Sequence, residues 1–116
     1  MKNDKGNVIV EKSFQFALDI VTYCELLEEN KKYVISKQLL RSGTSIGANI
    51  REAQNAESRV DFIHKMKIAA KEAEETQYWL LICKHSISYP ADEKLLENVD
   101  ELIRILAKII VTSKSN

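Results

Sequence analysis

Apolar side chains recur every three or four residues along four stretches of the chain, which is the period of an amphipathic α-helix. These stretches cover about residues 13–30, 34–54, 58–87 and 92–112. None of them shows the strict alternation of apolar and polar residues that marks a half-buried strand. The connections between them are short, and helices joined by short loops pack as neighbours that run in opposite directions. We therefore expect an all-α fold, an antiparallel up-down-up-down four-helix bundle.

The spacing also predicts which faces form the core. In the first helix the main stripe consists of Phe14, Ala17, Leu18, Val21, Cys24 and Leu27, and it is widened by Phe16, Ile20 and Tyr23. In the third helix the steps alternate between four and three residues, as in a heptad seam. That seam consists of Phe62, Met66, Ala69, Ala73, Thr76, Leu80, Cys83 and Ile87.

Capping residues mark the helix ends. Ser58 followed by Asp61 predicts the start of the third helix, because the serine oxygen can accept a backbone N–H and the acid suits the positive helix end. Asp92 is a favourable N-cap for the fourth helix. We expect the polar tail, Ser113 to Asn116, to fray.

Two glycines, Gly43 and Gly47, interrupt the second helical stretch. Each costs about 1 kcal/mol relative to alanine in a helix interior. Close contact with another helix would explain both, since residues four apart share a face and glycine lets another backbone approach. The alternative is a break in the helix at Ser42-Gly43-Thr44.

The third and fourth helices each carry a second apolar stripe, beyond what one core seam requires. On the third helix this stripe consists of Ile63, Ala70, Trp79 and Ile82, and on the fourth helix it consists of Leu96, Ile103 and Ile110. A helix that is apolar on two sides is either central or meets a partner chain, and no helix of a four-helix bundle is central. We therefore expect a homo-oligomer with these residues at its interface.

Composition is that of one ordinary globular domain, residues 1–116. Apolar residues make up 45% and charged residues 29% of the chain. The longest apolar run, Tyr78 to Cys83, is far shorter than the roughly 20 residues that span a membrane. The first residues lack the apolar stretch of a secretory signal. We expect a cytoplasmic protein with no membrane partner and with both cysteines reduced.

Charge is balanced overall, with 17 basic and 17 acidic residues, but it is unevenly distributed. Residues 31–71 hold nine basic and three acidic side chains, whereas the segments before and after are each net −3. A basic surface could bind the phosphates of nucleic acid. The candidate binding residues are Lys37, Arg41, Arg51, Arg59, Lys65 and Lys67. The alternative is that acidic first and fourth helices neutralise the basic middle ones.

Catalytic and cofactor motifs are absent from the sequence. The segment Gly43 to Gly47 lacks the Gly-Lys-Ser/Thr of a phosphate-binding loop. Asp61 and His64 share a helix face, but two ligands do not make a closed metal site. We expect no enzymatic activity, no metal and no cofactor.

Two segments are distinctive: SKQLLRSGTSIGANIREA at 36–53 and DFIHKMKIAAKEAEETQYWL at 61–80. Both resemble motifs of the four-helix-bundle proteins called 23S rRNA intervening-sequence proteins, and the resemblance extends from about Phe14 to Ile110. It implies an antiparallel bundle assembled into a ring-like homopentamer. A related bundle, the accessory protein of diversity-generating retroelements, is a basic pentamer that binds nucleic acid and a reverse transcriptase. No enzymatic activity is established for the family.

The sequence thus favours a non-enzymatic, oligomeric binding protein. Its ligand would be RNA or DNA, bound through the basic central segment, or another protein. The alternative is a purely structural assembly whose separated charges only order its own helices.

Overall fold

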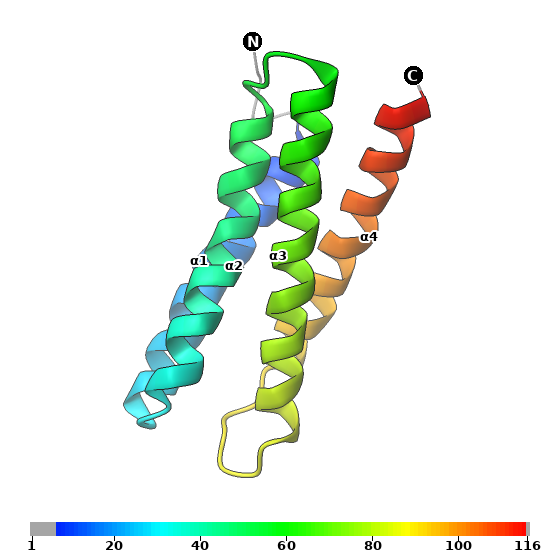
Figure 1. Ribbon diagram of the computed structural model, residues 1–116. Helices are drawn as coiled ribbons and strands as arrows, with labels where there is room; N and C mark the ends of the chain where they lie inside the picture. The colour runs from blue at the N-terminus through cyan, green and yellow to red at the C-terminus, as the bar shows by residue number, and fades with distance from the viewer. Residues whose placement is uncertain (1–6, 116) are drawn as a thin grey trace.

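The computed structural model describes residues 7–115, which form four α-helices and no strand. The helices are α1 (Val8–Glu29), α2 (Tyr33–Ala53), α3 (Arg59–His85) and α4 (Glu93–Ser115). Successive helices are joined at alternate ends of the molecule: Figure 1 shows the α1–α2 and α3–α4 loops at one end and the α2–α3 loop at the other. The expectation of an all-helical chain with four helices is therefore confirmed.

The helices pack around one core in an elongated molecule of 47 × 22 × 21 Å. Contacts run from α1 to α2, α2 to α3, α3 to α4 and α4 back to α1. Large side chains with almost no solvent exposure fill the interior from all four helices, including Phe16, Leu39, Ile46, Met66, Val99 and Leu106. Thr76 of α3 donates a hydrogen bond to Ser42 Oγ of α2 across this core, over 2.9 Å.

The buried face of α1 differs from the main stripe that the spacing predicts. Phe14, Leu18 and Val21 are 56%, 46% and 39% exposed, whereas Phe16 and Ile20 are buried. Two residues correspond to about 200° of helix rotation, so these two sets lie on nearly opposite faces while keeping the same spacing. The predicted widening positions are thus buried, together with Cys24 and Leu27 of the predicted stripe, whereas its Phe14, Leu18 and Val21 face outward.

Three helix ends also differ from the prediction. The first helix begins at Val8 rather than near residue 13, because Ile9 and Val10 are buried and Asn7 caps the helix by accepting the N–H of Val10. The third ends at His85, which leaves Ile87 fully exposed. The fourth continues through the polar tail to Ser115.

The predicted caps of α3 and α4 are confirmed. Ser58 Oγ accepts the N–H of Asp61 over 3.0 Å at the start of α3. Asp92 Oδ1 accepts the N–H of Leu95 over 3.1 Å at the start of α4. Both bonds satisfy backbone donors that have no partner within the helix.

The second helix is continuous through both glycines, so the alternative of a break at Ser42-Gly43-Thr44 is wrong. A methyl group built on Gly43 would lie 2.9 Å from two side-chain carbons of Ile20 in α1. The same group on Gly47 would lie 3.2 Å from the carbonyl oxygen of Ser13. Both glycines therefore lie where the backbone of α2 packs closely against α1.

Candidate nucleic-acid interface

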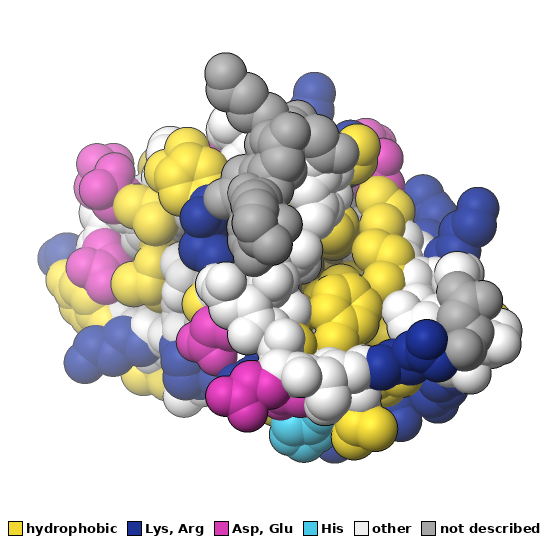
Figure 2. Space-filling view, turned by 90° about the horizontal axis from the view of Figure 1, so that it is seen from above, with side chains coloured by type: hydrophobic (Ala, Val, Ile, Leu, Met, Phe, Trp, Pro, Cys, Tyr) yellow, Lys and Arg dark blue, Asp and Glu magenta, His cyan; other side chains and the backbone are white. Residues whose placement is uncertain are grey.

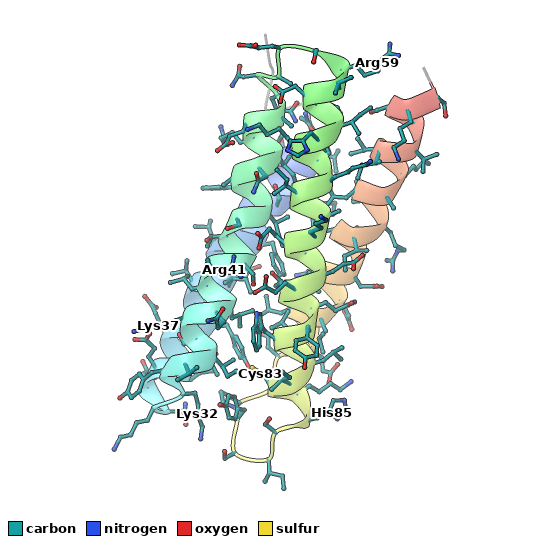
Figure 3. The ribbon with its side chains drawn as sticks, in the orientation of Figure 1. Lys32, Lys37, Arg41, Arg59, Cys83 and His85 are labelled. Carbon is teal, nitrogen blue, oxygen red and sulfur yellow. The ribbon has the colours of Figure 1, made fainter. Side chains whose placement is uncertain are left out.

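The six basic residues singled out by the sequence do not lie together. Lys37 and Arg41 belong to the half of α2 nearer the α1–α2 loop, whereas Arg59 lies at the far end of α3 (Figure 3). Arg51, Lys65 and Lys67 lie in the same half of the molecule as Arg59, since Lys65 reaches across to the end of α2. The linear segment 31–71 is thus divided between two ends of the bundle.

Arg41 is held by two carboxylates of α3. Its guanidinium forms ion pairs with Glu72, over 3.2 Å, and with Glu75. The hydrogen bond between Arg41 and Glu75 raises the pKa of the arginine and lowers the pKa of the Glu75 carboxyl. Trp79 Nε1 donates a further hydrogen bond to Glu75 over 3.0 Å. Arg41 therefore joins α2 to α3, and its charge is already compensated.

Lys65 has a similar role at the other end of the same helix pair. Its ammonium lies 3.2 Å from Glu52 Oε1 of α2. Like the Arg41 pairs, this contact joins α2 and α3 rather than the acidic first and fourth helices. The exposed side chain of Glu52 limits the strength of the pair, since solvent screens such contacts.

Lys67 lies among like charges. The amine of Lys114 lowers the pKa of Lys67, followed by desolvation and then by the charge of Lys71. All three side chains are exposed. Within residues 7–115, no carboxylate forms an ion pair with any of them. We call Lys67, Lys71 and Lys114 the α3–α4 lysine cluster.

The fold separates charge along the long axis of the bundle. Contacts between Gly47 and Ser13, and between Lys12 and Glu101, bring three segments to one end: 7–18, 44–71 and 101–115. This basic half holds nine basic and five acidic side chains, net +4. The acidic half, residues 19–43 and 72–100, holds six basic and eleven acidic side chains, net −5. Figure 2 looks onto the basic half and shows Lys and Arg side chains around its edge, on the side where α4 lies and on the opposite side.

The C-terminal half of α4 contributes to the basic half and was missed by sequence reasoning. Residues 102–116 contain three basic residues and no acidic one, namely Arg104, Lys108 and Lys114. Averaging over 72–116 concealed them behind the carboxylates of the preceding segment. Counting charge separately for each half of each predicted helix would have found them, because opposite halves of a helix lie at opposite ends of a bundle.

The acidic half contains a groove. It lies between α1 and α4, has a volume of about 640 Å³, and is lined by four carboxylates together with Tyr23 and Lys94. The carboxylates are Asp19, Glu25, Glu29 and Asp92. Their charge repels an anionic ligand, so this groove is not a candidate phosphate site.

The residues predicted to form an oligomer interface are all half-buried within one chain. Ala70, Trp79, Leu96, Ile103 and Ile110 pack against the chain's own core. Ile63 and Ile82 are half-buried as well. Part of the apolar surface of the second stripes of α3 and α4 is therefore already buried inside the bundle.

A different apolar surface, the α1–α2 apolar face, is more exposed. It consists of Phe14, Leu18 and Val21 of α1 with Leu40 of α2, each between 39% and 56% exposed. A groove of about 230 Å³ beside it is lined by Phe14, Ala17, Thr44, Gly47 and Ala48, among others. The sequence did contain this signal, but the spacing assigned the α1 residues to the core.

Other chemistry has little support among the described residues. No group of three or more His, Cys, Asp or Glu side chains in 7–115 could hold a metal ion. None of the helices in that range is long and apolar enough to cross a membrane. Cys24 and Cys83 are free and buried, and burial raises the pKa of the Cys24 thiol to about 11. A thiol of this kind is a poor nucleophile at neutral pH.

Comparisons with known proteins agree on one family. The model of the family described as 23S rRNA-intervening sequence protein matches residues 5–109. A solved structure from Bacteroides thetaiotaomicron VPI-5482 is 48% identical, covers 88% of this chain and 97% of its own, and superposes with a TM-score of 0.82. That structure is described as a protein with unknown function from the S23 ribosomal protein family. None of the curated proteins matches this chain.

Proposed function

This chain belongs to the 23S rRNA-intervening sequence protein family, and from that premise we propose that it is a non-enzymatic, self-associating protein that binds nucleic acid. One observation carries the proposal: the fold collects a net charge of +4 in one half of a chain whose total charge is zero. Separation of charge on this scale creates a local field that attracts polyanions, although the whole chain is neutral.

Phosphates are the chemistry that the basic half fits best. Lysine and arginine neutralise backbone phosphates and release the counterions that surround a nucleic acid. Nothing in the basic half resembles a ladder of exposed aromatic rings for stacking on single-stranded bases, as far as residues 7–115 are concerned. We expect binding to RNA and DNA with slight sequence preference.

Self-association through the α1–α2 apolar face is the second part of the proposal. The face has an acidic edge on α1, with Glu11 and Glu25, and a basic edge on α2, with Lys37 and Arg51. A surface with opposite charges on its two edges can meet a second copy so that acid faces base. The assembly we propose is a cytoplasmic ring of antiparallel bundles, and the family resemblance implies that the ring has five subunits.

The rival function is a purely structural assembly without a nucleic-acid ligand. The pairing of Arg41 with Glu72 and Glu75, and of Lys65 with Glu52, favours it. These contacts use basic side chains to join α2 to α3 within one chain. They account for two of the six candidate binding residues and leave the α3–α4 lysine cluster unexplained.

A binding titration across a salt series tests the proposal. Fluorescently labelled RNA and DNA fragments of mixed sequence are titrated with the protein at several salt concentrations. We expect measurable affinity at low salt that falls steeply and linearly on a log–log plot as salt rises. If neither RNA nor DNA binds at the lowest salt, the proposal fails and the structural assembly remains as the function.

A further inference from the structure

Two contacts within one chain show which residues of α1 and α2 lie at the same level of the bundle. Near one end, the α2 backbone at Gly47 lies against the carbonyl oxygen of Ser13. Toward the other end, Ser36 Oγ donates a hydrogen bond to the carbonyl oxygen of Cys24 over 3.2 Å. Residue numbers therefore rise along α1 as they fall along α2, and each position of α1 has a level counterpart on α2.

The two edges of the α1–α2 apolar face carry opposite charges at the same spacing. Each edge is a line of three residues placed about two helix turns apart, so the three share one side of their helix. The line on α1 consists of Glu11, Leu18 and Glu25, and the line on α2 consists of Lys37, Thr44 and Arg51. Both lines therefore have charged residues at their ends, acidic on α1 and basic on α2.

The acids of one edge are level with the bases of the other. Glu25 is level with Lys37, and Glu11 with Arg51, to within about two residues or 3 Å of helix rise. All four side chains are exposed. Within residues 7–115, neither Glu25 nor Lys37 forms an ion pair in its own chain. A second copy that brings its α1 edge beside this α2 edge at the same level would place acid against base at both ends.

The apolar residues between the edges correspond in the same register. Phe14 is level with Gly47, and Val21 with Leu40. The groove beside Gly47 has a volume of about 230 Å³. Pockets for small molecules usually have volumes of roughly 300–1,000 Å³, so this groove suits a single side chain better. Phe14 is the bulkiest member of the apolar face and is 56% exposed.

We infer that α1 of one subunit packs along α2 of the next at the same level, with Glu25 beside Lys37 of the next subunit and Phe14 in the groove beside its Gly47. The inference rests on the self-association in the proposed function, because a second copy supplies the opposite edge. Rotation about an axis along the bundle keeps every residue at its level, so the register within one chain also applies between chains. An interface between two different edges can continue round a closed ring, whereas a surface that pairs with itself gives a dimer.

Reversal of charge at one edge, and then at both, tests the pairing. Sedimentation over a concentration series gives the concentration at which half of the chains are assembled. We expect Glu25→Lys and Lys37→Glu each to raise it by about tenfold or more, because like charges then meet. The double variant Glu25→Lys with Lys37→Glu should return to within about threefold of the wild type. Lys94→Glu and Glu97→Lys, at exposed positions of α4, are the matched controls and should each stay within about threefold.

Mixing the two single variants shows whether the pair forms between chains. In an equimolar mixture, Glu25→Lys chains can alternate with Lys37→Glu chains, so that lysine again meets glutamate across each such contact. We expect the mixture to assemble at a lower total concentration than either variant alone.

A truncation tests the groove. Phe14→Ala should raise the concentration of half-assembly by about tenfold or more, because it removes an aromatic anchor from the interface. Tyr78→Ala, at a 60% exposed position of α3 outside the face, is the control and should behave like the wild type. Circular dichroism verifies the helical content of every variant.

The outcomes distinguish this register from self-association itself. Recovery of assembly in the double variant and in the mixture supports the pairing of Glu25 with Lys37. Single reversals that behave like their controls, or a double variant that stays dissociated, overturn the pairing while self-association stands. A Phe14→Ala variant that assembles like the wild type overturns the placement of Phe14 in the groove. A monomeric wild type overturns the proposed self-association, and the register with it.

Discussion

At the scale of single residues, Gly43 shows how a locally unfavourable choice is stabilised by its neighbours. A glycine costs about 1 kcal/mol in a helix interior. Here the missing side chain makes room for Ile20, which has no solvent exposure and packs directly on the α2 backbone. Ile20 is β-branched and stiff at its first dihedral angle, so it cannot easily move aside.

We therefore predict that Gly43→Ala destabilises the protein despite the gain in helix propensity. The added methyl group would lie 2.9 Å from Ile20 carbons, and overpacking of this kind typically costs about 1–3 kcal/mol. Gly47→Ala is the matched comparison: its methyl group would meet the Ser13 carbonyl oxygen at 3.2 Å, a milder overlap than at Gly43, so it should cost less than Gly43→Ala. Denaturant unfolding measures both, and a gain in stability for Gly43→Ala would show that the contact with α1 is loose.

At the scale of elements, the helices and their caps were predictable but their faces and charges were only partly so. Ser58 and Asp92 cap their helices as the residues alone indicated. The outward face of α1 was not predictable from spacing, because Phe14 and Phe16 begin two equally regular stripes. Only the packing of α2 and α4 against one of them decides between the two.

For the candidate site, the sequence likewise does not reveal which residues of other helices the basic side chains of α2 contact. Its sequence reveals that Arg41 is basic, but not that Glu72 and Glu75 of α3 lie opposite it. Which residues pair across two helices depends on how far the helices are shifted relative to each other along their axes. Residue spacing within a single sequence does not reveal that shift. The basic residues in the C-terminal half of α4 could have been found by counting charged residues separately in the two halves of each predicted helix.

The link between α2 and α3 predicts a specific dependence of stability on pH. Arg41 lowers the pKa of Glu75 in the folded protein below the ordinary value, so this carboxylate stabilises the fold at neutral pH. The contribution is fully present above the unfolded pKa of about 4.3 and is lost as pH falls through the lower folded value. Its size is modest, because solvent screens an exposed pair.

We expect the free energy of unfolding of Glu75→Gln to fall less than that of the wild type between pH 6 and pH 3, about the usual acid range for carboxylates. Glu97→Gln, at an exposed position of α4, is the control and should follow the wild-type curve. Parallel curves for wild type and Glu75→Gln would mean that Arg41 does not select the ionised form of Glu75.

At the scale of the whole molecule, assembly would bring the basic halves of several chains together into one basic surface. Cyclic symmetry places the equivalent point of every subunit at the same height along the ring axis. In the ring we propose, bundles that stand along that axis would therefore put all their basic halves on one face. Several basic halves on one face could contact one nucleic acid together, so the proposed binding would be multivalent and stronger than that of a single chain.

The assembly predicts that the wild-type chain sediments at micromolar concentration as a species several times its mass of 13.3 kDa. Leu18→Glu should shift it toward the monomer, because the variant places a charge in the α1–α2 apolar face, where Leu18 is 46% exposed in the single chain. A stable interface buries roughly 800 Å² on each partner, so one central charge is expected to be costly. Val60→Glu, at a 78% exposed position of α3 outside this face, should leave the assembly intact. Equal dissociation by both variants would locate the interface elsewhere, and a monomeric wild type would remove both the ring and the shared basic face that depends on it.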